Sequence, residues 1–160
     1  MADYDLGVPR VHVVEESSAT PDRILEAARD FSPRRAELWR DVHTEYLTIH
    51  DQGDTWADVT EGNPWPIGHV WERLRYDWSR PDVVRGTVVD SNLFKRGSTW
   101  EIRATQTAAG GSRVEITAIR HLKGRGRLLW PFFPLGLARR DVSAYLRQFL
   151  HQVERTSDRK

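Results

Sequence analysis

Three charged residues occupy positions where strand-like segments are otherwise apolar or small, and their types could support proton transfer. They are Glu72, Asp90 and Arg120, each at an alternate position of its segment. If those apolar faces form the concave side of a sheet, two carboxylates and one guanidinium point into a cavity. A carboxylate withdrawn from water favours its protonated form unless a cation balances it, which suits general acid–base catalysis. The alternatives are a structural ion pair at the sheet rim, or a β-bulge that exchanges the faces.

Aromatic and small residues on the same faces predict an apolar pocket wall. Trp100 shares its face with Ile102 and Ala104, so we expect it to point inward, and Gly86 leaves further room on an inward face. Core packing is the alternative role of the aromatic residues. The predicted ligand-binding residues are Trp39, Tyr46, Trp56, Tyr76, Trp78, Trp100, Ala104, Ala118, Tyr145 and Phe149.

Strand-like segments separated by turn residues predict the antiparallel sheet that positions these side chains. After the first segment, Thr20 and Pro21 predict the start of one short helix, with Thr20 as its cap, and Ser32-Pro33 the start of a second. The predicted strands are Val11–Ser18, Thr44–His50, Thr55–Glu61, His69–Trp78, Val83–Ser91, Gly97–Thr107 and Arg113–Leu122.

A long helix is predicted from Asp141 onward, because apolar residues recur there every three or four positions. They are Val142, Tyr145, Leu146, Phe149, Leu150 and Val153. Such a stripe needs a sheet to cover it. We therefore expect an α+β domain over residues 10–155, with six to seven strands, two short helices after the first strand, and flexible termini at 1–9 and 156–160.

Composition excludes several classes of function. The 24 Lys and Arg residues nearly balance the 23 Asp and Glu residues, so nucleic acid is not an expected partner. Cysteine is absent, which excludes disulfides and thiolate catalysis. The six histidines show no metal-ligand spacing, and no cofactor fingerprint appears, so neither a metal nor a cofactor is expected. No signal peptide and no run of roughly 20 apolar residues is present, which favours a soluble cytoplasmic protein.

An apolar segment interrupted by prolines, residues 128–137, precedes the long helix. Its Trp130, Phe132 and Phe133 are predicted to form a lid over the cavity mouth. The alternative is a transient contact with a membrane surface, because basic residues flank these aromatic side chains.

The order of elements and several local motifs resemble the START-like (SRPBCC) superfamily, in particular its polyketide cyclase/dehydrase-like and lipid-transport-like members. The motifs are Ala19–Leu25, Trp71-Glu72-Arg73, Tyr76-Asp77-Trp78, Gly97–Trp100 and Gly111–Glu115. This resemblance implies a helix-grip fold, in which a curved antiparallel sheet wraps around the C-terminal helix and leaves a ligand cavity between them. The fold by itself says little about which ligand is bound.

The leading functional hypothesis is binding or carriage of a hydrophobic small molecule: a lipid, a polyketide or an aromatic metabolite. The first alternative is a cofactor-free polyketide cyclase or dehydratase that uses Glu72, Asp90 and Arg120. The second is a protein-interaction module, including a homodimer, that uses exposed aromatic side chains.

Overall fold

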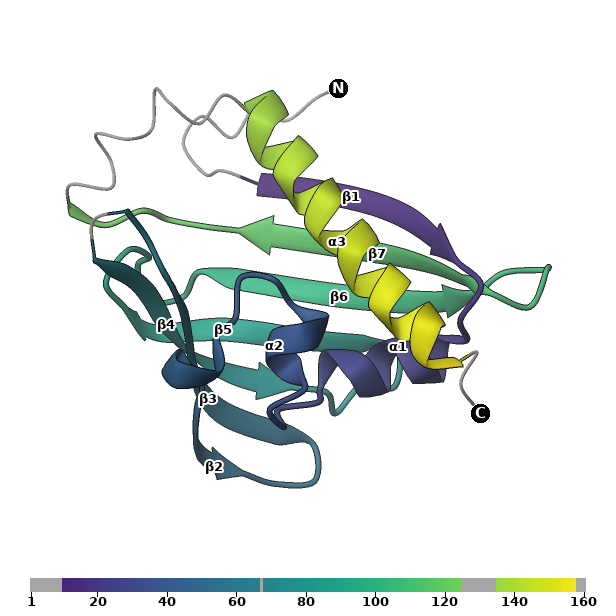
Figure 1. Ribbon diagram of the computed structural model, residues 1–160, viewed down its shortest axis with the longest axis horizontal. Helices are drawn as coiled ribbons and strands as arrows, with labels where there is room; N and C mark the ends of the chain where they lie inside the picture. Colours follow the sequence, from purple (N-terminus) through teal and green to yellow (C-terminus); the bar gives the residue numbers. More distant parts are fainter. Residues whose placement is uncertain (1–9, 67, 125–134, 158–160) are drawn as a thin grey trace.

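Seven antiparallel strands form one sheet in the computed structural model, which describes residues 10–66, 68–124 and 135–157. The sheet order is β1-β7-β6-β5-β4-β3-β2, so the chain forms hairpins from β2 to β7 and places β1 at the outer edge beside β7 (Figure 1). The strands are β1 (Arg10–Ser17), β2 (Thr48–Gln52), β3 (Trp56–Pro64), β4 (His69–Asp77), β5 (Val83–Ser91), β6 (Thr99–Gln106) and β7 (Ser112–Ile119).

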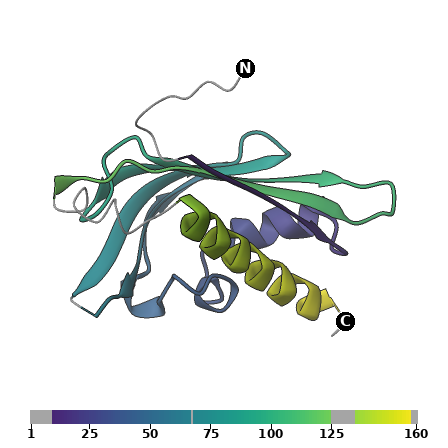
Figure 2. The same cartoon turned by 90° about the horizontal axis from the view of Figure 1, so that it is seen from above.

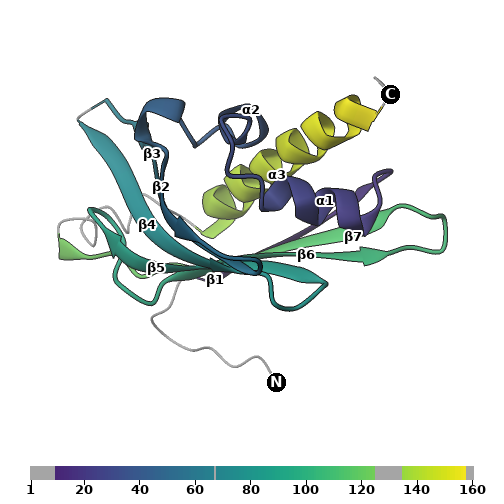
Figure 3. The same ribbon diagram turned by 90° about the horizontal axis from the view of Figure 1, so that it is seen from below.

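The helices all lie on one face of this sheet (Figure 2). Two short ones, α1 (Pro21–Ala28) and α2 (Arg35–Leu38), follow β1, and the long α3 (Leu135–Ser157) ends the fold. On the same side, β4, β3 and β2 bend toward the helices, so the sheet curves around α3 (Figure 3). The predicted helix-grip architecture is therefore confirmed.

The apolar stripe of α3 forms the centre of the core. Leu146, Phe149, Leu150 and Val153 are all buried, and the helix packs on β1 and against α1 and α2. The inward residues of the sheet meet this stripe, among them Val13, Leu74, Ile102 and Val114. Burial of these side chains is what fixes the helix on the concave face.

Several local expectations differ from the structure. The long helix begins at Leu135 instead of Asp141, and the second short helix at Arg35 instead of Ser32-Pro33. The predicted strand Thr44–His50 begins instead as a 3₁₀ turn, η1 (Thr44–Tyr46), with β2 following it. The chain turns there because the Tyr46 and Leu47 amides donate to the carbonyls three residues earlier, at 2.9 and 3.2 Å. Thr20 precedes α1, but its side chain makes no capping hydrogen bond, and Pro21 alone matches the predicted start signal.

Candidate ligand-binding cavity

A cavity of about 560 Å³ lies between the concave face of the sheet and α3. Strands β1, β3, β4, β6 and β7 contribute to one wall, and α3 to the other. The loop after α2 and the segments that follow β3, β5 and β7 complete the lining. Its aromatic lining residues are Trp65, Trp71, Phe94, Trp100 and Tyr145, and its polar lining residues include Glu61, Glu72 and Arg120.

Glu72 and Arg120 meet inside this cavity. The guanidinium donates from Nη1 and Nη2 to the two carboxylate oxygens, at 2.5 and 3.2 Å, and the Phe94 ring centroid lies 4.7 Å from its central carbon. Burial alone would lower the pKa of Arg120, but the charge and hydrogen bonds of Glu72 outweigh it and the pKa is raised. The two groups therefore form a stable ion pair, in which the Glu72 side chain is 18% exposed and the Arg120 side chain 22% exposed.

Asp90 does not join this pair, because β5 contains a bulge. Arg73 is opposite Asp90, whereas the next residue, Leu74, is opposite Val88, so Val89 is the extra residue. The bulge reverses the alternation and turns Asp90 to the outer face, where its side chain is 64% exposed and its Oδ1 lies 3.7 Å from Lys123 Nζ. The expectation that Asp90 faces the cavity is thus not met.

A second, deeper ion pair joins Arg35 of α2 to Glu61 of β3. The guanidinium donates from Nε to Glu61 Oε1, and from Nη1 to the Ala28 and Asp30 carbonyls at 2.9 and 3.3 Å. The Tyr76 hydroxyl accepts from Arg35 Nη2 and donates to Glu61 Oε2, each at 3.0 Å. Arg35, Glu61 and Tyr76 thus form one network at the inner end of the cavity, which Glu61 lines.

Burial and charge set the protonation of this network. Burial by itself would lower the pKa of Arg35, yet the charge and hydrogen bond of Glu61 raise it overall. Burial, followed by the charge of Glu61, raises the pKa of Tyr76 well above its ordinary value. Arg35 is therefore charged and the Tyr76 phenol is protonated. The Phe31 ring, 4.4 Å from the guanidinium carbon, covers the cation.

Sequence reasoning missed Arg35 and Glu61, although a signal for each was present. Glu61 continues the apolar face of Ala57 and Val59, both fully buried in the structure. Arg35 shares a helical stripe with Leu38 and Trp39 at spacings of three and four. The search for charged residues on apolar faces that selected Glu72 would also have selected these two.

Several predicted ligand-binding residues belong to the packed core. Trp39 stacks on Phe149, with ring centroids 4.0 Å apart and planes 11° apart, and both are almost fully buried. Its indole nitrogen makes no hydrogen bond within the described part of the chain. Tyr76 and Ala104 are also buried, and neither is among the residues that line the cavity.

Trp100, Ala118 and Tyr145 do line the cavity. Gly86 has a different role from the expected one of leaving room for a ligand. A Cβ there would lie 2.9 Å from Trp100 Nε1 and 3.1 Å from Tyr76 Cε1. The space above Gly86 is therefore filled by these two rings.

Three aromatic residues of the predicted set lie elsewhere. Tyr46 stacks on His69, with ring centroids 5.2 Å apart, and Trp56 lies on the outer face beneath the Arg75 guanidinium. Trp78 donates from its indole nitrogen to the Asp54 carbonyl at 2.9 Å. None lines the cavity. The predicted lid residues Trp130, Phe132 and Phe133 fall outside the described residues.

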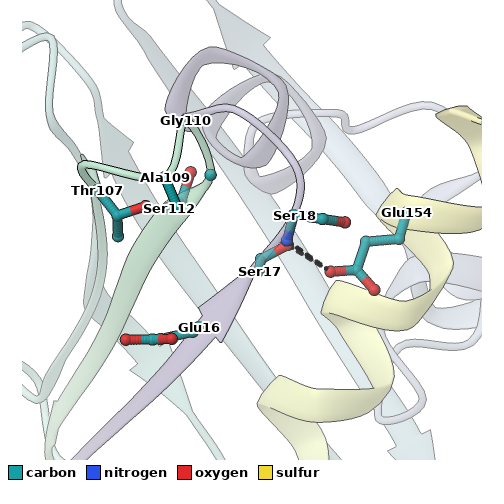
Figure 4. A pocket seen from close by; sticks show the side chains of 9 residues that line it. Glu16, Ser17, Ser18, Thr107, Ala109, Gly110, Ser112 and Glu154 are labelled. Carbon is teal, nitrogen blue, oxygen red and sulfur yellow. Dashed lines mark hydrogen bonds between the residues drawn. The ribbon is translucent and has the colours of Figure 1, made fainter.

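A second hollow lies between the turn after β1 and the β6–β7 hairpin, and most of its lining residues have polar side chains (Figure 4). There Glu154 Oε1 accepts hydrogen bonds from Ser17 Oγ at 2.7 Å and from the Ser18 amide at 3.0 Å. Burial would raise the pKa of Glu154, but these hydrogen bonds lower it overall. The contacts fasten the C-terminal part of α3 to the end of β1.

Neither a metal centre nor a membrane span is found in the described ranges. Within them, no three acidic or histidine side chains gather closely enough to hold a metal ion. No helix in the same ranges is long and apolar enough to cross a bilayer.

Comparison with solved structures identifies the architecture. A protein from Thermus thermophilus, TTHA0849, superposes with a TM-score of 0.76 at 18% identity, over 93% of this chain and 99% of that one. A START superfamily protein from Mycobacterium smegmatis gives a TM-score of 0.74 at 10% identity, over 94% and 99%. The chain has the START-like fold.

Solved structures of proteins with other descriptions also superpose on this START-like fold. The Zhui aromatase/cyclase from Streptomyces sp. R1128 gives a TM-score of 0.70 at 16% identity, over 93% of this chain and 95% of that one. No protein-family model and no curated protein matches the sequence. At these identities, the START-like neighbours establish the fold and leave the function to be argued from the site.

Proposed function

We propose that this protein binds a hydrophobic small molecule, a lipid, polyketide or aromatic metabolite, in the cavity between its sheet and α3. The observation that carries the proposal is the cavity itself, whose volume of about 560 Å³ lies inside the range of small-molecule sites. Its aromatic lining offers flat apolar surface to a ligand. The START-like neighbours, which include a protein described as an aromatase/cyclase, add support.

Filling the cavity tests this proposal. Ala118→Trp places an indole in the cavity wall and should weaken binding of the neutral fluorophore N-phenyl-1-naphthylamine at least about tenfold, because ligand and side chain compete for one space. Thr105→Trp, on the exposed outer end of β6, is the matched control and should leave binding unchanged. Two results together would contradict the proposal. The wild-type protein would take up no fluorophore, and its native and denatured mass spectra would show no small molecule released on denaturation.

A second candidate function is a cofactor-free cyclase or dehydratase, favoured by the Glu72–Arg120 pair inside the cavity. Glu72 would accept a proton from a carbon next to a ligand carbonyl, and Arg120 would stabilise the negative charge that develops on its oxygen. Asp90 takes no part in this version, because it lies on the outer face. Glu72→Gln should keep ligand affinity within about threefold and abolish turnover. Equal turnover by the variant excludes this role of Glu72.

A further inference from the structure

The charged groups on the sheet side of the cavity are arranged in a compensated row. Glu61 and Glu72 are directly opposite each other on β3 and β4, so their Cβ atoms lie roughly 5 Å apart on one face. Two carboxylates at this distance repel each other. Each is neutralised by its own arginine, Glu61 by Arg35 and Glu72 by Arg120. The four formal charges cancel, so this side of the cavity has charged groups without a net charge.

Hydrogen-bond donors remain unused beside this row. Of the five N–H groups of Arg120, two are occupied by Glu72, and no other described residue accepts from the guanidinium. Tyr145 projects from α3 into the same cavity, and its hydroxyl makes no hydrogen bond within the described part of the chain. Burial, followed by the charges of Glu61 and Asp41, raises the pKa of Tyr145 well above its ordinary value, so its hydroxyl stays protonated and able to donate.

We propose that the ligand lies with a neutral oxygen-bearing end, a ketone, phenol or alcohol, toward α3, where it accepts a hydrogen bond from Tyr145 beside the Glu72–Arg120 pair. This inference rests on the proposed binding function and adds the orientation and class of the ligand. The apolar body of the ligand packs against Phe94 and Trp100.

Two alternative ligand ends fit this part of the cavity less well. A hydrocarbon end leaves the Tyr145 hydroxyl desolvated without an acceptor, which costs free energy. An ionised carboxylate end could accept from the unused N–H groups of Arg120, but it enters a region that already holds Glu61 and Glu72 and whose formal charges cancel. No net positive charge there offsets the water that the carboxylate loses. Arg40, Asp41 and Asp141 line the cavity as well, and all three are exposed. Arg40 Nε lies 3.7 Å from Asp41 Oδ1, so these three groups have a net negative charge and a carboxylate is not favoured beside them either.

Three probes of one shape test the class of ligand. Isothermal titration calorimetry at pH 7 should show 2-naphthol binding about tenfold more tightly than 2-methylnaphthalene, and at least about tenfold more tightly than 2-naphthoate. The first comparison exchanges a hydroxyl for a methyl group of similar size. The second adds a negative charge. Equal affinity for all three probes, or tightest binding of 2-naphthoate, overturns the inference and leaves the proposed binding function intact.

Tyr145→Phe tests the donor itself. It should weaken 2-naphthol binding about tenfold while 2-methylnaphthalene binds as before, so the preference disappears. Tyr46→Phe, which removes a hydroxyl outside the cavity, should retain the preference. A Tyr145→Phe protein that melts like the wild type and keeps the full preference overturns the role of Tyr145. If none of the three probes binds and N-phenyl-1-naphthylamine does not bind either, the proposed binding function is wrong, and this inference is wrong with it.

Discussion

The two ion pairs on the concave face are held in different ways. Arg35 is fully buried, and all its hydrogen bonds go to protein groups, including the main chain at the end of α1. Arg120 bonds only to Glu72 among the described residues and faces the cavity. We therefore assign a structural role to Arg35–Glu61, whereas Glu72–Arg120 is available to a ligand.

Removing the Arg35 cation should destabilise the fold severely. Arg35→Met leaves the Glu61 carboxylate buried without a counter-ion, and we expect the free energy of unfolding in urea to fall by about 3–5 kcal/mol. Arg34→Met, its exposed neighbour, should change it by less than about 0.5 kcal/mol. The double variant Arg35→Met/Glu61→Gln should recover part of the loss. An Arg35→Met protein as stable as the wild type would refute the structural role.

Gly86 should not tolerate even one added methyl group. Tyr76, Gly86 and Trp100 are opposite one another on β4, β5 and β6, and the two rings meet edge to face over the glycine, with centroids 5.8 Å apart. Gly86→Ala should cost about 1–3 kcal/mol, measured by urea unfolding, because Trp100, Leu74 or Tyr76 must move. Adding Trp100→Phe should relieve part of that cost, whereas an equally unstable double variant would show that the crowding lies elsewhere.

At the scale of elements, α3 is fastened firmly only along its C-terminal part. Leu146, Phe149, Leu150 and Val153 are buried there, and Glu154 bonds to the end of β1. Closer to its N-terminus, Asp141, Val142 and Tyr145 line the cavity instead. The same helix thus anchors the fold at one end and contacts the ligand space at the other.

The Glu154 anchor should make stability depend on pH in the acid range. Its pKa is lower in the folded protein than its ordinary value of 4.5, so its contribution is complete above that pH and is lost as pH falls through the folded pKa. Glu154→Gln should therefore cost about 1 kcal/mol at pH 7 and less at pH 3, by urea unfolding. Glu26→Gln, an exposed change on α1, controls for the lost charge. A cost of Glu154→Gln that is the same at both pH values would argue against the anchor.

For the whole molecule, the cavity links ligand binding to stability. Space left between sheet and helix costs packing energy that a bound molecule can restore. A ligand that binds only the folded state at 100 times its Kd adds about 2.7 kcal/mol to the free energy of unfolding.

2-Naphthol at that concentration should accordingly raise the melting temperature of the wild-type protein. The rise in melting temperature should be smaller for Ala118→Trp, whose indole occupies part of the cavity. For the outer-face variant Thr105→Trp it should equal the rise of the wild-type protein. Differential scanning fluorimetry measures all three. Identical shifts in the three proteins would place the binding site outside the cavity.

Much of this architecture could be predicted from the sequence. Alternation along the strands and the stripe on α3 are properties of the chain itself, so they indicated the sheet, the long helix and the shared inward side of Glu72 and Arg120. The pattern of apolar residues could not show which inward side chains belong to the packed core and which line the cavity. Trp39 and Trp100 are both inward-facing indoles, and only the position of α3 buries one and leaves the other beside the cavity.

The tertiary structure alone decided which charges meet. One extra residue, Val89, turned Asp90 outward, and the position of a bulge is defined by pairing with the neighbouring strand, which one segment of sequence does not show. The Arg35–Glu61–Tyr76 network joins a helix to two strands, so it depends on strand register and on where α2 packs. The sequence by itself determined the faces of each element, because side-chain direction follows the local backbone. Which faces meet, and which leave a cavity, followed only from packing the elements together.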